Sequence, residues 1–530
     1  MEVALYDTTL RDGAQRAGVS FSVDDKLKIA RRLDELGVHY IEGGWPGSNP
    51  KDVEFFQRAR VLELGVASVV AFGSTRRVGI DADKDPNLSA LLESGARTCT
   101  IVGKCWDLHV TEVLGAALDE NLRMVADSVR YLKSKGLTVF FDAEHFFDGF
   151  KRNGEYALKV LEAAAEAGSD CLVLCDTNGG ALPEEVTVAV EQAKGIGVPL
   201  GIHAHDDGGL ALANTLAAVR AGATQAQGTI NGYGERCGNA NLCSIIATLK
   251  LKLGIDCVRD DQLGKLTEIS HYVSELANLS PDPQLPYVGA SAFTHKGGLH
   301  VSGLMKQDES YQHIDPDLVG NRSQVLVSEL SGTSNIRYKA QELGLEVPET
   351  EQARAVLDQI KDLENQGFQF EGAEASFELM LRRIQPGYKP PFELVDFLVV
   401  VERQRRAPVA SPTEELLCEA IVKVMVGGRL QHTAAEGNGP VNALDAALRK
   451  ALLEHYPSLT AVELTDYKVR ILEESQGTES RVRVLVESSD GEHEWRTVGS
   501  STNIIEASWT ALTDSMEYWL ARWGPSGVGG

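Results

Sequence analysis

Short apolar runs alternate with amphipathic stretches along the first half of the chain. The amphipathic stretches are typical of helices: one follows Ser22, a favoured N-cap residue, and later ones end at glycines suited to a C-cap. Eight such strand–helix units in succession predict a (β/α)8 TIM barrel of the α/β class. The apolar runs, typical of buried strands, cover residues 3–6, 40–43, 68–72, 99–102, 138–141, 171–175, 200–204 and 224–229.

A doubly wound open sheet is the alternative arrangement for alternating strands and helices. The count of eight strands argues against it. No glycine-rich phosphate-binding fingerprint follows the first strand, and such a fingerprint is typical of the open sheet. We therefore expect the closed barrel.

The alternation stops near residue 254, and the tail of the chain contains a repeat. Residues 419–452 resemble residues 480–516, and each segment reads as a strand, a turn, a second strand and a helix. This repeat predicts a small regulatory or dimerisation module. The corresponding helix positions are Ala443 with Ala507, Ala447 with Ala511, and Leu448 with Leu512.

A chain of 530 residues is too long for one hydrophobic core, so more than one domain is expected. The patterns divide the chain into a catalytic barrel at 1–255, helical linker subdomains at 256–390 and a C-terminal α+β regulatory dimerisation domain at 391–525.

Composition excludes several classes of function. The net charge of −25 argues against nucleic acid as a partner, because phosphate binding needs a basic field. No apolar run approaches the ~20 residues of a membrane helix, and no signal peptide is evident. The eight cysteines show no CxxC spacing and are typical of reduced thiols, so we expect a cytoplasmic protein.

Polar side chains stand at or just after the ends of the predicted strands. In TIM barrels the chemistry lies where these carboxyl ends meet. No single residue is diagnostic, but their coincidence at one rim predicts an active site. The rim residues are Arg11, Asp12, Gln15, Glu42, Asp142, Glu144, Asp176, Thr177, Asn178, His203, His205, Glu235, Arg236 and Asn239.

His203 and His205 lie two residues apart on one predicted strand, so both imidazoles face the same side. With Asp12 they form a His2Asp set that leaves coordination positions open, as a catalytic metal site needs. Zn, Mn and Mg all fit, although two imidazoles argue against a site built for Mg alone. The alternative is two partly buried histidines bonded to their neighbours.

Three further rim residues have both a chemical and a structural interpretation. Arg11 is a permanent positive charge for a developing oxyanion, or the partner of Glu42 in a structural ion pair, and both roles can hold together. Thr177 offers a hydroxyl and an N–H for a substrate carboxylate, or caps the turn before the next helix. Glu144 transfers a proton or holds a loop.

With these residues identified, the chain resembles the 2-isopropylmalate, homocitrate and citramalate synthases of the DRE-TIM metallolyase superfamily. The resemblance covers nearly the whole chain. It rests on "DTTLRDGAQ" on the first strand, "HAHDD" on the seventh, "GTINGYGERCGNANL" on the eighth, "FTHKGGLHVSGLMK" in the helical segment and "WRTVGSSTNIIEASWTAL" in the tail.

The resemblance implies a set of roles. A divalent metal is bound by Asp12, His203 and His205, with Asn239 at or near its coordination sphere. The substrates are contacted by Arg11, Gln15, Glu42 and Thr177, and Arg11 also polarises the keto group. Acid–base chemistry involves Glu144, His300 and Tyr311. In the family the last two reach the mouth of the partner subunit's barrel, which implies a homodimer.

Within this family, residues 40–56 ("YIEGGWPGSNPKDVEFF") and 141–151 ("FDAEHFFDGFK") are most similar to the longer citramalate synthases. These join pyruvate to acetyl-CoA on the way to isoleucine, and the tail would bind that amino acid as effector. The alternatives are a 2-isopropylmalate synthase using 2-oxoisovalerate, a homocitrate synthase, an acyl-CoA lyase or aldolase, and a non-catalytic amino-acid sensor. Two positions depart from many relatives, Ala14 and Ser500.

Overall fold

The computed structural model describes residues 2–307, 310–328, 330–402, 417–472 and 480–524. Two compact units make up the chain. The barrel unit comprises Met1–Phe293 with His313–Ser323, and the C-terminal unit comprises Thr294–Gln312 with Gln324–Gly530. Each unit is described separately below. The domain boundaries expected at residues 255 and 390 stay predictions.

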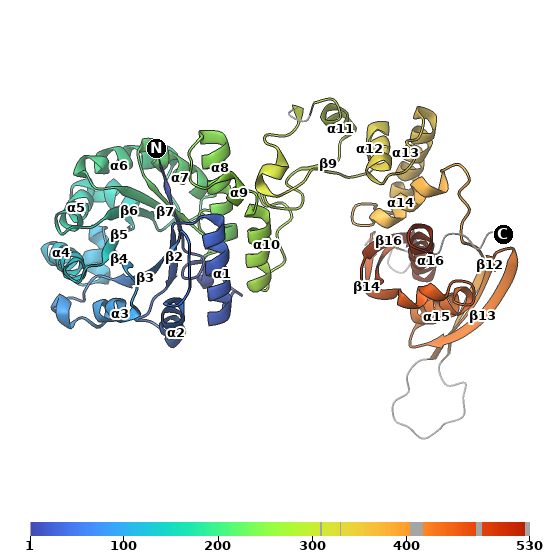
Figure 1. The fold of residues 1–530 in the computed structure, drawn as a ribbon, viewed down its shortest axis with the longest axis horizontal. Helices are drawn as coiled ribbons and strands as arrows, with labels where there is room; N and C mark the ends of the chain where they lie inside the picture. The colour runs from blue at the N-terminus through green and yellow to red at the C-terminus, as the bar shows by residue number, and fades with distance from the viewer. Residues whose placement is uncertain (1, 308–309, 329, 403–416, 473–479, 525–530) are drawn as a thin grey trace, which may run out of the picture. The chain divides into compact units, whose positions relative to one another are not determined.

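Eight parallel strands close into a barrel in chain order, with β1 hydrogen-bonded to β8 (Figure 1). The TIM barrel is therefore confirmed, and the open sheet is excluded. Each predicted apolar run forms a strand, because strands buried on both faces carry nearly continuous apolar sequence. The strands are β1 (Ala4–Asp7), β2 (Tyr40–Gly44), β3 (Ser68–Ser74), β4 (Thr98–Lys104), β5 (Thr138–Glu144), β6 (Cys171–Asp176), β7 (Leu200–Ala204) and β8 (Gln225–Gly228).

Helices follow the strands and surround them (Figure 1). The Ser22 hydroxyl accepts a hydrogen bond from the Asp25 N–H and caps the first helix, as predicted. The fifth helix begins at Phe146 and contains one non-helical residue, Asn153. The helices are α1 (Val23–Leu36), α2 (Pro50–Ala59), α3 (Pro86–Ser94), α4 (Leu118–Ser134), α5 (Phe146–Glu166), α6 (Pro183–Ala193), α7 (Ala211–Ala221) and α8 (Leu242–Leu253).

The segment after the barrel is mainly helical, as predicted. Two helices, α9 (Asp260–Leu263) and α10 (Leu266–Leu276), belong to the barrel unit, where α10 packs against α1. The part in the C-terminal unit contains β9 (Thr294–His295), α11 (Gly298–Leu304), β10 (Gln324–Val325), α12 (Thr333–Glu342), α13 (Thr350–Asn365) and α14 (Glu374–Arg383).

The tail contains two βββα repeats, so each repeat has one strand more than the sequence pattern predicted. In both, a threonine hydroxyl donates to the helix at 2.7 Å: Thr433 to the Ala447 carbonyl and Thr497 to the Ala511 carbonyl. The repeats are β11 (Phe392–Glu402), β12 (Leu417–Val426), β13 (Arg429–Gly437) and α15 (Pro440–Leu452), then β14 (Glu463–Ile471), β15 (Val482–Ser489), β16 (Glu494–Ser501) and α16 (Ile504–Arg522).

The missed first strands carry a recurring sequence of their own. "ELVDF" begins at Glu393 in β11, and "ELTDY" begins at Glu463 in β14. Both strands shift register at the same place in this sequence, between Leu394 and Asp396 and between Leu464 and Asp466. The repeat therefore extends to bulges at matching positions. A bulge interrupts the strict alternation of apolar residues, so a search for that alternation does not detect these strands.

The sequence also raises expectations about the cysteines and about membrane-spanning helices. All eight cysteines lie within the described residues, and all are free thiols. Among the described helices, none combines the length and the apolar character needed to cross a membrane.

Candidate active site

A tight turn after β1 brings Arg11 and Asp12 to the mouth of the barrel. Asp7, the last residue of β1, accepts hydrogen bonds from the Thr9 N–H at 2.9 Å and from the Thr9 hydroxyl at 2.7 Å. The Thr8 carbonyl then accepts from the N–H groups of Arg11 and Gly13. Burial raises the pKa of Asp7 to about 7. The first motif is thus a strand whose polar end folds back and directs the next two charged residues to the rim.

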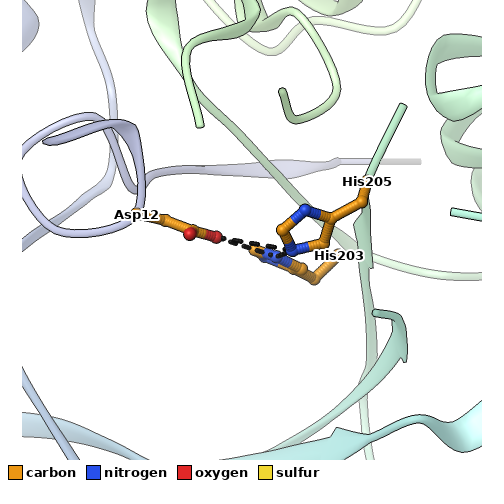
Figure 2. A group of neighbouring side chains, drawn as sticks. All are labelled: Asp12, His203 and His205. Atoms are coloured by element: carbon orange, nitrogen blue, oxygen red, sulfur yellow. Dashed lines mark hydrogen bonds and ion pairs between the residues drawn. The ribbon is translucent and has the colours of Figure 1, made fainter. Parts of the chain in front are cut away.

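Asp12, His203 and His205 converge at the mouth and are all buried (Figure 2). The Asp12 Oδ2 lies 3.2 Å from the His203 Nε2 and 3.7 Å from the His205 Nε2, and the two Nε2 atoms are 3.3 Å apart. Two ligands of one tetrahedral Zn²⁺, each at about 2.1 Å, would be roughly 3.4 Å apart. The spacing of the three atoms therefore fits a divalent ion.

Asn239 joins this group through the backbone. A β-bridge pairs His205 with Asn239, so the loop after β8 lies against the end of β7. The Asn239 Nδ2 donates to the Asp12 Oδ2 at 2.8 Å, while its Oδ1 is buried and meets no donor among the described residues. A buried carbonyl oxygen without a partner is costly and suits a place at or near a cation.

Charges at the mouth balance one another. Burial alone would raise the pKa of Asp12, but Arg11 and His203 outweigh it and hold that pKa well below its usual range. Burial alone would lower the pKa of His203, but its hydrogen bond to Asp12 and the charge of Asp12 raise it. Burial and the neighbouring His203 lower the pKa of His205 to about 4. The contact with Asp12 therefore favours the protonated form of His203.

Arg11 is fixed from two sides. Its Nε lies 2.5 Å from the Glu42 Oε2, and its guanidinium carbon lies 3.9 Å from the centre of the Phe72 ring. The Tyr6 hydroxyl donates to the other Glu42 oxygen at 2.7 Å. Burial opposes the charge on Arg11, but Glu42 and Asp12 outweigh burial and raise its pKa further. The structural ion pair with Glu42 is thus present, and it presents a fixed cation 3.8 Å from the Asp12 Oδ1.

Two acids on β5 have different surroundings. Asp142 is buried, and its pKa is raised to about 7 by burial and by the charge of Glu42. The Asp142 Oδ1 has no donor among the residues that the structure describes. Glu144, at the end of the strand, forms an ion pair with Lys104 at the end of β4. Glu144 also lines a cavity of about 440 Å³ with Trp45 and Lys104.

Thr177 follows β6 and is held at both of its oxygens. Its hydroxyl accepts from the His145 N–H at 2.9 Å, and its carbonyl accepts from the Arg236 Nη2 at 2.8 Å. The hydroxyl is therefore bonded to the β5 loop, whereas the alternative interpretation made it a cap for the turn before α6.

Gln15 is exposed and lies in the short 3-10 helix Gly13–Gln15. With Arg11 and Ala14 it lines a cavity of about 470 Å³, which Trp45 and Lys51 also line. Ala14, one of the two departures from many relatives, is thus a wall of this cavity next to Arg11.

His300 and Tyr311 belong to the C-terminal unit, where their rings stack with centroids 4.4 Å apart. Their approach to a barrel mouth stays a prediction, as do the chemical roles of the other site residues.

A third cavity, of about 600 Å³, lies within the C-terminal unit between α15 and β14. Asp445 on α15 forms an ion pair with Arg449 at 2.8 Å, and Arg449 also donates to the Val462 carbonyl. The Asp445 Oδ1 is buried and has no hydrogen-bond partner among the described residues. This cavity therefore combines apolar walls with an acidic oxygen that lacks a donor.

Sequence reasoning missed three residues that shape the mouth. Phe72 lies in an apolar strand and is typical of core. Gln227 accepts from the His203 Nδ1 at 3.0 Å, which leaves the Nε2 lone pair for a ligand. The presence of a glutamine inside a buried strand is the signal that could have identified Gln227. Lys104 ends β4, so the strand-end argument that found Glu144 also applied to Lys104.

The chain matches three protein families in succession. Residues 2–273 match the HMGL-like family, residues 287–367 the homocitrate synthase post-HMGL domain-like family, and residues 371–520 the LeuA allosteric (dimerisation) domain. The (R)-citramalate synthase of Geobacter sulfurreducens is 55% identical over 522 residues, which cover 98% of each chain. The (R)-citramalate synthase of Aquifex aeolicus is 51% identical over 524 residues, again 98% of each chain. A probable 2-isopropylmalate synthase of Methanopyrus kandleri is 32% identical over 511 residues, 96% of each chain.

Proposed function

Because the chain belongs to the HMGL-like family and, within it, to the (R)-citramalate synthases, we propose that it condenses acetyl-CoA with pyruvate to give (R)-citramalate and CoA. This acyl transfer would serve the threonine-independent route to isoleucine in the cytoplasm. The observation that carries the proposal is full-length identity of 55% and 51% to two such synthases. The donor set at the barrel mouth supports it.

Asp12, His203 and His205 would hold the divalent metal, with Asn239 beside them. The ion, which is Mn, Mg or Zn, would act as a Lewis acid toward the keto acid when bound. The spacing of the three donor atoms and the bare Asn239 Oδ1 support this assignment.

Arg11 would stabilise the oxyanion that develops when the acetyl carbon attacks the ketone. Glu42 and Phe72 already fix the guanidinium, so little reorganisation is needed at the moment of reaction. Thr177 would bind the keto-acid carboxylate through its hydroxyl. Gln15 and Glu42 would complete the substrate contacts.

Glu144 would take part in the acid–base chemistry, together with His300 and Tyr311 contributed across a homodimer. A base removes a proton from the acetyl methyl group, and the new carbon–carbon bond joins that carbon to the pyruvate C2. Water then hydrolyses the thioester and releases CoA, which makes the reaction effectively irreversible. The ion pair of Glu144 with Lys104 keeps the Glu144 carboxylate at the rim of the barrel.

The test is the release of CoA thiol from acetyl-CoA with a panel of keto acids. We expect the highest kcat/KM with pyruvate. A higher value with 2-oxoisovalerate would instead identify a 2-isopropylmalate synthase. No release with any keto acid would exclude a synthase, and cleavage of an acyl-CoA substrate would then separate a lyase from an amino-acid sensor.

Regulation by an amino acid, with isoleucine as the expected effector, is the second part of the proposal. The match to the LeuA allosteric (dimerisation) domain and the cavity between α15 and β14 support it. The Asp445 Oδ1 would accept from the effector's ammonium group. We expect Asp445→Asn to raise the isoleucine concentration for half-inhibition at least tenfold. Glu454→Gln, which neutralises an exposed acid just after the same helix, is the matched control.

A further inference from the structure

Thr177 lies between two residues whose backbones adopt the left-handed region. His145, on the β5 side, has φ 54°, and Arg236, on the β8 side, has φ 55°. Residues other than glycine rarely adopt this conformation, and where they do the surrounding structure must hold them. Both donate hydrogen bonds to Thr177 and to different oxygens of it. Two strained loops therefore meet at one residue.

The bond from His145 determines what the Thr177 hydroxyl can do. A hydroxyl has one hydrogen and two lone pairs. The His145 N–H occupies one lone pair at 2.9 Å, and no acceptor for the hydroxyl hydrogen lies among the described residues. Thr177 is thus left with a hydrogen to donate, which suits an anionic ligand.

Side-chain contacts hold His145 in its strained conformation. Its ring lies 4.3 Å from the ring of His109, which in turn stacks on Trp106 at 5.0 Å. Its Nδ1 lies 3.3 Å from Asp148, and Asp148 also accepts from the side chain of Asn178 at 3.0 Å. Asn178, the residue after Thr177, is therefore hydrogen-bonded to the same Asp148 carboxylate as His145.

A charged contact holds Arg236. Its Nε and Nη2 donate to the two oxygens of Asp207, each at 2.8 Å, and the Nη2 also donates to the Thr177 carbonyl at 2.8 Å. Asp207 in turn lies against Gly179, where a Cβ would come within 2.6 Å of the Asp207 Oδ2. The loops after β6, β7 and β8 are thereby connected through one guanidinium.

We propose that Arg236, oriented by Asp207, is a positioning residue that holds Thr177 so that its hydroxyl donates to the keto-acid carboxylate. The inference rests on the proposed function for the role of Thr177 and goes beyond it by naming the residues that act through Thr177. Arg236 touches the substrate only through that neighbour.

A double-mutant cycle with Arg236→Gln and Thr177→Val tests the proposal, with pyruvate KM as the readout. We expect Thr177→Val to raise this KM at least tenfold, because a hydrogen bond to a charged group is lost. Arg236→Gln should raise it about five- to tenfold and leave the KM for acetyl-CoA and kcat within about twofold. The double variant should match Thr177→Val within about twofold, since Arg236 acts only through the hydroxyl.

Three companion measurements keep the proposal falsifiable. Asp207→Asn, which loosens Arg236 without touching Thr177, should shift pyruvate KM in the same direction by a smaller factor. Arg220→Gln, which removes an exposed arginine on α7, is the matched control and should change neither KM. Thermal unfolding of each variant separates a loss of fold from a loss of positioning.

Two outcomes overturn the inference while the proposed condensation of acetyl-CoA with pyruvate stands. One is an equal KM increase from Arg236→Gln in the wild-type and Thr177→Val backgrounds. The other is an unchanged pyruvate KM in Thr177→Val. Absence of CoA release by the wild-type protein with every keto acid is a different result and defeats the proposed function itself.

Discussion

Among the described residues, two clusters of charged side chains invite comparison, one at the barrel mouth and one between α14 and α16 in the C-terminal unit. Both combine at least one arginine with two or more carboxylates. The second, here named the α14–α16 network, consists of Glu378, Arg382, Arg383, Tyr388, Asp514, Glu517, Tyr518 and Arg522.

Each carboxylate of the α14–α16 network has donors. Glu378 accepts from Arg382 at 2.6 Å, from the Tyr518 hydroxyl at 3.0 Å and from Arg522. Arg383 bridges Asp514 and Glu517 at 2.8 and 2.6 Å. Such a completed network joins two helices and leaves no oxygen for a ligand.

The barrel mouth is incomplete by comparison. Among the described residues, the Asp142 Oδ1, the His205 Nδ1 and the Asn239 Oδ1 are buried without hydrogen-bond partners. The same residue types therefore serve different ends, and the difference lies in whether the donors and acceptors are matched. Unmatched atoms indicate where a ligand or cation completes the structure.

The largest effect should come from removing the carboxylate that the two histidines share. Asp12→Asn should lower turnover at least ~10³-fold, since a bound metal contributes several kcal/mol as a Lewis acid. Elemental analysis of the purified variant should show the loss of metal. Asp170→Asn, just before β6 at the opposite end of the barrel, is the control and should retain both metal and turnover. Full metal content in Asp12→Asn would contradict the assigned ligand set.

Arg11→Lys should produce the next largest effect. Lysine keeps the charge but has a single nitrogen, so it cannot bond Glu42 and also direct further donors into the site as the planar guanidinium does. We therefore expect kcat to fall by 10²-fold or more. Metal content should stay at the wild-type level, which distinguishes this variant from Asp12→Asn. Near-wild-type turnover would show that the oxyanion role is wrong and that the ion pair with Glu42 is structural only.

Breaking the completed network should affect stability and leave catalysis alone. Glu378→Gln replaces a buried carboxylate whose arginine partners are partly exposed, so the cost should be about 2 kcal/mol, less than for a fully buried pair. For a unit of this size the unfolding midpoint should fall by roughly 4–8 °C. Glu374→Gln, an exposed acid at the start of α14, is the control. A large loss of turnover in Glu378→Gln would remove the distinction between the two clusters.

Burial and the alternation of side chains along a strand explain which regions the sequence predicts and which it does not. The barrel strands were predictable because burial on both faces makes them apolar throughout, as in Cys171–Asp176. The histidine pair was predictable because alternate residues on a strand share a face. β11 was missed because its register shifts at Leu394 and because Leu394 and Leu398 are exposed, so alternation does not mark the buried face. Phe72 was missed because a phenylalanine that stacks against an arginine cannot be distinguished by sequence from an ordinary core residue.

The smallest effect concerns protons at the barrel mouth. A divalent ion needs the Nε2 of His203 and of His205 unprotonated. Burial would lower the pKa of His203, but Asp12 outweighs it and raises that pKa, so at lower pH the ion must displace a proton from His203. His205, whose pKa is lowered to about 4, is already neutral and gives up none. The apparent Kd for Mn²⁺ should therefore rise toward tenfold per pH unit as pH falls below the raised pKa of His203, with a slope that approaches one proton.

Calorimetric titration with Mn²⁺ in buffers of different ionisation enthalpy measures this slope directly. A slope of two would show that His205 is also protonated, and a slope of zero would show that Asp12 does not raise the pKa of His203. Glu378→Gln should give the wild-type slope, because the α14–α16 network has no unmatched site for a proton or an ion to fill. A proton and a cation thus compete for one incomplete cluster, which is the property that separates the mouth from the network.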